Sequence, residues 1–75
     1  MTAPINDGRI PQPTEDWPFI VAGYGKDGRL LLVTRHKNAH SKDVEVTAWR
    51  SRIRSGEVRE AKVWSLTTSE ETIWR

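Results

Sequence analysis

The side chains that could carry acid–base or metal chemistry gather in one polar segment. His36 and His40 are four residues apart, and Ser41 and Asp43 follow them. On a helix that spacing would place both imidazoles on one face, ready for a metal. We expect a strand end and a loop here, where the spacing fixes no geometry. A Ser–His–Asp triad also needs a scaffold and an oxyanion hole, so we predict neither a metal site nor catalytic residues.

Other enzyme signatures are equally weak. The adjacent acids at positions 15–16 and 70–71 point in different directions on a strand or a helix. Gly23 and Gly25 lead with Lys26 into a turn and not into a helix, so they do not predict a phosphate site. The chain has no cysteine, which excludes disulfides and thiolate ligands. We predict a protein that is not an enzyme and needs no cofactor.

Tryptophan and arginine stand out from this background. The chain has 4 tryptophans in 75 residues, and an indole ring can serve either a core or a binding surface. We expect Trp64 in the core and leave both roles open for Trp17 and Trp49. Three arginines alternate along residues 50–54, and alternation on a strand would place them on one face. The predicted partner-binding residues are Arg50, Arg52, Arg54, Arg59, Lys62 and Trp49.

Charge is unevenly distributed along the chain. Residues 29–62 hold nine basic and four acidic side chains, which gives +5, whereas the whole chain carries +2. This asymmetry is typical of proteins that bind a polyanion or an acidic protein surface. A solvated basic face without a partner would produce the same pattern.

The longest apolar run is residues 30–33, far short of the roughly 20 residues that span a membrane. The start of the chain lacks the basic and apolar pattern of a signal peptide. Together with the absence of cysteine, these features predict a cytoplasmic protein without membrane contact.

The first predicted element is a β-hairpin. Residues 17–24 are aromatic and β-branched, and Asp27-Gly28 separates them from a return strand over 29–37. Both faces of this hairpin are apolar near the turn, so we expect cover on both sides. A second hairpin, the N-terminal arm, a second subunit or a partner could provide it. A two-residue turn pairs positions 24 with 31, 22 with 33, 20 with 35, 23 with 32, 21 with 34 and 19 with 36.

A second, longer hairpin is predicted after a polar loop over 38–43. Residues 44–54 and 57–66 would form its strands, with the turn at Ser55-Gly56. The preferred register pairs Arg50 with Glu60 and Trp49 with Ala61, and such pairs stabilise a sheet by about 0.2–1 kcal/mol each. The charged end of this hairpin would project as a ribbon.

The elements predict a mainly all-β fold. It would be a small antiparallel meander of four to five strands, either barrel-like or an open sheet. Residues 1–16 hold three prolines and predict an extended arm, either loose or held by Ile5 and Ile10, before a single β domain over 17–75. Thr68 and Glu71 match a capping box and predict a short terminal helical turn. A strand over 72–75 is the alternative.

These features favour a protein-binding regulator or inhibitor that docks on a larger protein through an Arg/Trp ribbon, because Trp, Tyr and Arg dominate binding hot spots. Its small size suggests that a phage or a mobile element encodes it. The alternative is a nucleic-acid-binding ribbon, with Arg and Lys on phosphates and Trp stacked on bases. The apolar first hairpin could also support self-association.

Overall fold

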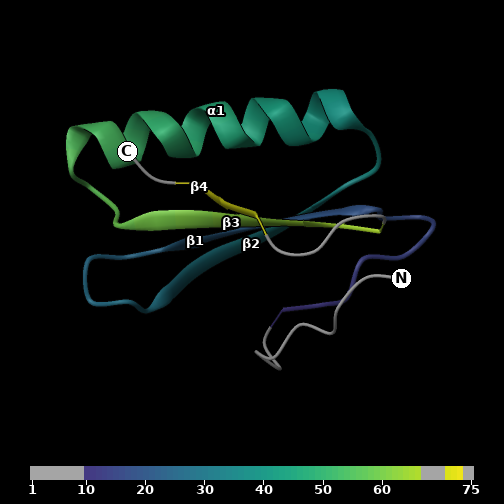
Figure 1. Ribbon diagram of the computed structural model, residues 1–75, viewed down its shortest axis with the longest axis horizontal. Helices are drawn as coiled ribbons and strands as arrows, with labels where there is room; N and C mark the ends of the chain where they lie inside the picture. Colours follow the sequence, from purple (N-terminus) through teal and green to yellow (C-terminus); the bar gives the residue numbers. More distant parts are fainter. Residues whose placement is uncertain (1–9, 67–70, 74–75) are drawn as a thin grey trace.

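The computed structural model describes residues 10–66 and 71–73. One long helix lies across one face of an antiparallel sheet (Figure 1). The sheet order is β2-β1-β3-β4, and each neighbouring pair is antiparallel. The elements are β1 (Phe19–Tyr24), β2 (Leu30–His36), α1 (Ala39–Ser55), β3 (Glu60–Ser65) and β4 (Glu71–Ile73).

The antiparallel sheet confirms the β-rich part of the prediction, but the meander is wrong. Residues 44–54 were predicted as a strand and lie within α1. The chain therefore crosses the sheet through α1 before β3 pairs with β1. The predicted helical turn at the C-terminal end is also wrong over Glu71–Ile73, which form β4. Thr68 and residues 74–75 lie outside the described part of the chain.

Side-chain and backbone caps fix both ends of α1. Asn38 precedes the helix, and its side-chain oxygen accepts a hydrogen bond from the Ser41 N–H at 2.8 Å. At the other end Gly56 has a φ of 86°, and the Glu57 N–H donates to the Arg52 carbonyl at 3.0 Å. This is the left-handed conformation that lets glycine end a helix.

Over the described residues, no helix is long and apolar enough to cross a membrane.

The first hairpin keeps most of its predicted register because two irregularities cancel. The loop has three residues, Lys26 to Gly28, one more than predicted, and the Gly25 N–H donates to the Arg29 carbonyl across it. A bulge at Leu31 then takes up the extra residue. Five of the six predicted pairs are therefore confirmed, and only Tyr24 changes its partner, to Leu30.

Both faces of the sheet are covered, as its apolar composition predicts. On one face α1 supplies Trp49 and Ile53 to the core. On the other face Ile10 packs over Trp64 and leaves it 5% exposed. Ile5, the other expected anchor, lies outside the described residues. The two clusters are Val21, Trp49, Ile53, Val58, Ala61 and Val63, and Ile10, Ile20, Ala22 and Trp64.

The closest approach between α1 and the sheet occurs at Gly23. A Cβ atom added to Gly23 would stand only 2.1 Å from Cη2 of Trp49, well inside van der Waals contact. The indole ring of Trp49 therefore rests directly on the backbone of β1. Only glycine permits this contact, because any other residue would place a side chain where the ring lies.

We expect Gly23→Ala to destabilise the fold by about 1–3 kcal/mol or more, since the core has no room for the added methyl group. The melting temperature should fall by about 4–8 °C for each kcal/mol in a domain of this size. Gly25→Ala is the matched control, because its Cβ would come no closer than 3.3 Å to an exposed Asp27 side chain. Equal melting of both variants would contradict the contact.

The opposite core depends on Trp64. We expect Trp64→Ala to cost about 3–5 kcal/mol, because the indole leaves a cavity between the sheet and Ile10. Leu66→Ala is the control, since Leu66 is 39% exposed. Thermal and urea unfolding of the two variants measure the difference, and parent-like unfolding of Trp64→Ala would refute the assignment.

Candidate binding surface on the β2 edge

β2 lies at one edge of the sheet and has β1 as its neighbour on one side; no described strand lies on the other. Two consecutive leucines on this strand are half-exposed, Leu31 at 55% and Leu32 at 49%. Two exposed cations follow them, Arg35 on the strand and Lys37 just beyond its end. With Trp17, these residues form what we call the β2 edge surface: Trp17, Leu31, Leu32, Arg35 and Lys37.

Glycines on β1 and beside it explain why the two leucines are exposed. Leu32 pairs with Gly23, and Leu31 is the extra residue of the bulge. Leu31 lies about 3.5 Å from the position of an ideal Cβ on Gly25. Neither glycine carries a side chain that could cover its neighbour, so the leucines form an apolar spot beside the open edge.

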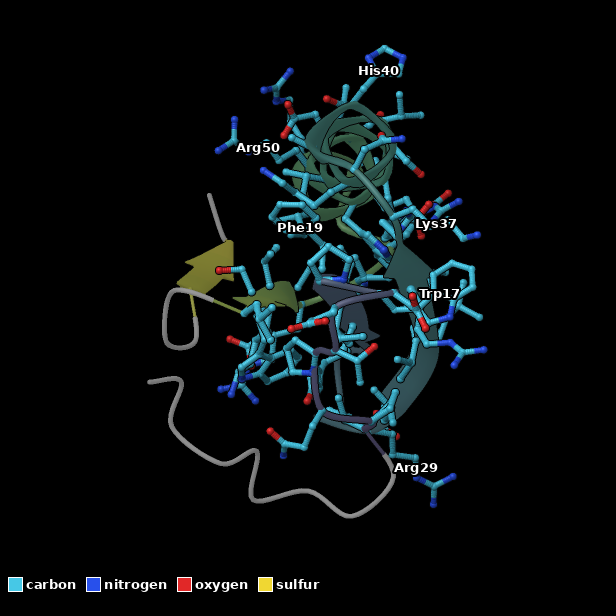
Figure 2. The ribbon with its side chains drawn as sticks, turned by 90° about the vertical axis from the view of Figure 1, so that its right-hand side faces the viewer. Trp17, Phe19, Arg29, Lys37, His40 and Arg50 are labelled. Atoms are coloured by element: carbon cyan, nitrogen blue, oxygen red, sulfur yellow. The ribbon has the colours of Figure 1, made fainter. Side chains whose placement is uncertain are left out.

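Trp17 organises the cations at the other end of the surface. The guanidinium carbon of Arg35 lies 4.8 Å from the ring centroid, and Nζ of Lys37 lies 5.0 Å from it. Cation–π contacts at exposed sites contribute about 0.5–1 kcal/mol each. Figure 2 shows Trp17 and Lys37 on the same side of the molecule. Their contacts hold two long, flexible side chains beside the edge strand.

The three arginines that were predicted to share a face do not share one, because they lie on α1. Successive helical residues rotate by about 100°, so Arg50 and Arg54 point to one side and Arg52 to the opposite side. Arg50 points away from the side that holds Trp17 and Lys37 (Figure 2). The guanidinium carbon of Arg52 lies 4.7 Å from the ring centroid of Trp49.

The remaining predicted binding residues are also dispersed. Trp49 is 3% exposed, and its Nε1–H donates to Glu45 Oε2 at 3.1 Å, so it belongs to the core. Arg59 is exposed in the connection before β3. Lys62 lies 5.4 Å from the ring centroid of Tyr24. The six predicted residues therefore do not form one continuous surface.

The sequence of the first hairpin holds signals for the surface that does form. Arg35 lies near the end of β2 and Lys37 directly follows the strand, and both side chains contact the Trp17 ring. The run of apolar residues over 30–33 is longer than one buried face requires. No sequence pattern predicts the bulge that exposes Leu31, because the bulge depends on the length of the hairpin loop.

The polar residues 36–43 separate into two groups. His36 is buried, and its Nδ1 lies 2.7 Å from Ser41 Oγ while its Nε2 lies 2.8 Å from Thr34 Oγ1. Asp43 is exposed and pairs with Lys42 at 2.7 Å. No carboxylate therefore orients the imidazole, as a triad requires. The chain of hydroxyl, imidazole and hydroxyl ties the end of β2 to the first turn of α1.

His40 points away from the sheet at the outer side of α1 (Figure 2). A shallow depression there is lined by His40, Asp43, Val44 and Thr47. These residues come from one face of a single helix, which does not enclose a ligand. No group of three metal-binding side chains occurs within residues 10–66 and 71–73.

We expect Ser41 to be a structural residue and not a nucleophile. A fluorophosphonate probe should leave Ser41 unlabelled, because no carboxylate supports its histidine partner. Ser41→Ala should lower the free energy of unfolding by about 1–3 kcal/mol, the cost of leaving a buried polar group without its partner. Mass spectrometry and thermal unfolding test both expectations. Labelling that disappears in Ser41→Ala would instead establish a nucleophile.

Comparison with known proteins gives no relative from which a function could be transferred. No protein-family model matches the chain. No curated protein and no solved structure matches it either. The β2 edge surface is therefore the basis for a functional proposal.

Proposed function

We propose that this chain is a non-enzymatic protein-binding regulator that docks on a larger protein through the β2 edge surface. The observation that supports this is an edge strand with two half-exposed leucines toward the face of α1 and two cations, held by Trp17, toward the opposite face. An apolar centre with a polar, charged rim is the usual anatomy of a protein interface.

The arrangement is more than scattered surface hydrophobicity. Single exposed leucines are normal in soluble proteins and need no explanation. Here Leu31 and Leu32 are adjacent, and the strand that carries them has an open side. In this proposal the chain regulates or inhibits its partner by occupying part of the partner's surface.

Nucleic-acid binding is the second candidate, supported by a different observation. Arg50 and Arg54 lie one turn apart on an exposed side of α1, where they could contact phosphates. In the described part of the chain, Arg29 pairs with Asp27 and Lys42 pairs with Asp43, and neither Arg50 nor Arg54 belongs to these pairs. Such binding would weaken steeply with salt, by a log–log slope of roughly −0.7 to −0.9 for each phosphate contact.

Site-specific photo-cross-linking distinguishes the two surfaces. A benzophenone amino acid at Leu31 should capture a protein in extracts of the cells that produce this chain. The matched control carries the same amino acid at Ser51, which is exposed on α1. We expect a protease-sensitive, nuclease-resistant adduct from position 31 and a much weaker one from position 51.

Charge reversal provides the complementary measurement. Arg35→Glu with Lys37→Glu should abolish the adduct from position 31, whereas Arg50→Glu with Arg54→Glu should leave it intact. A nuclease-sensitive adduct at position 51 would favour nucleic-acid binding. No adduct at either position would exclude both surfaces.

A further inference from the structure

The backbone of β2 offers hydrogen-bonding groups along its open side. The carbonyls of Tyr24 and Pro18 on the β1 side of the sheet accept hydrogen bonds from Arg59 and Leu66, so even-numbered residues of β1 direct their backbone groups toward β3. Val33 and Arg35 pair with two of these even-numbered residues, Ala22 and Ile20. In an antiparallel ladder such pairs exchange no hydrogen bonds. The N–H and C=O groups of Val33 and Arg35 therefore point away from β1.

The inward-facing residues of β2 behave in the opposite way. Leu32 and Thr34 pair with Gly23 and Val21, whose backbone groups point toward β2. Their amides are therefore satisfied within the sheet. The open edge thus presents a short, regular set of donors and acceptors from alternate residues, which is the template that an added strand requires.

The charges along this edge are complementary to carboxylates. Arg29, Arg35 and Lys37 are all exposed. Asp27 pairs with Arg29 at 3.4 Å. Arg35 and Lys37 are two residues apart, so a strand beside β2 would bring its own alternate side chains next to both.

We propose that the partner supplies an extended acidic segment that pairs with β2 as an additional strand. This segment would carry two carboxylates at alternate positions beside Arg35 and Lys37, and apolar side chains beside Leu31 and Leu32. The inference rests on the proposed function and names the chemistry of the partner. Main-chain hydrogen bonds would supply affinity, and the side chains would supply selectivity.

One antiparallel register of a second copy on this edge is opposed by charge. In an antiparallel pairing centred on Val33, Lys37 lies opposite Arg29 of the second copy, and like charges in that position destabilise a ladder. Arg35 would lie opposite Leu31 of the second copy, which leaves its charge without a counterpart. The charges that oppose self-pairing are those that an acidic strand would neutralise.

Trp17 prepares the surface for such a segment. Because Arg35 and Lys37 already lie on its ring, less side-chain freedom is lost when carboxylates bind. Trp17 acts here as a positioning residue. Trp17→Ala should weaken binding of an acidic peptide more than it weakens binding of the same peptide with glutamine in place of glutamate.

The test uses the full chain and two synthetic peptides, Leu-Leu-Val-Thr-Glu-Thr-Glu and its reverse sequence, which allow for parallel or antiparallel pairing. Amide hydrogen exchange is measured by NMR with and without each peptide. We expect protection to increase at Val33 and Arg35 and to stay unchanged at Leu32 and Thr34. Peptides with lysine in place of glutamate should bind at least about tenfold more weakly, which corresponds to 1.4 kcal/mol.

Two sets of variants separate strand pairing from simple charge attraction. Alternate residues of the bound peptide would direct their N–H groups toward β2. N-methylation of these residues should abolish binding, and N-methylation of the residues between them should preserve it. Arg35→Glu with Lys37→Glu should weaken binding at least about tenfold, while Arg50→Glu with Arg54→Glu should not change it.

Several results would overturn the inference. The first is that both sets of N-methylated peptides bind equally well, and the second is that the lysine peptides bind as tightly as the glutamate peptides. The third is that single-stranded oligothymidylate displaces the acidic peptide. The fourth is a dimer of the chain whose contact protects Val33 and Arg35. Absence of binding by either peptide would also overturn it. A protein adduct at position 31 in that case would leave the proposed function standing and reject only strand addition.

Discussion

The contact of Trp49 with Gly23 determines how the helix sits on the sheet. A side chain at position 23 would hold α1 away from β1, whereas glycine lets the indole reach the backbone. Glu45 accepts a hydrogen bond from the indole Nε1–H, and Arg52 stacks on the ring from its own helix. These two contacts orient the ring on α1, and the contact of the ring with Gly23 places the helix over the sheet.

A sheet that is apolar on both faces needs two covers, and a short chain has few elements to provide them. Here α1 covers one face, and the segment around Ile10 covers the other. Each core is small: domains of this size bury only about 60% of the surface of their unfolded chain. With both faces of the sheet occupied, its edge is the part of the β structure that remains open to a partner.

The first hairpin could be predicted because local signals decide it. Asp27-Gly28 set its position, and composition set its two-sided burial. The helix was missed because Val44, Val46 and the three arginines alternate as a strand would. The pattern that indicates the helix is the spacing of three and then four residues between the apolar side chains of Val46, Trp49 and Ile53. Gly56 could not resolve the ambiguity, because a left-handed glycine suits both a helix end and a hairpin loop.

The candidate site shows how placement depends on the element. Arg35 and Lys37 lie at the end of β2 and both contact the Trp17 ring, whereas Arg50 and Arg52, also two residues apart, lie on opposite sides of α1. The proposed surface uses the residue types that the sequence singled out, arginine and tryptophan, but other members of each type. An open strand with unpaired backbone groups tends to join another copy of itself. In the proposed interaction, cations at the end of β2 would favour a strand of opposite charge over a second copy of the chain.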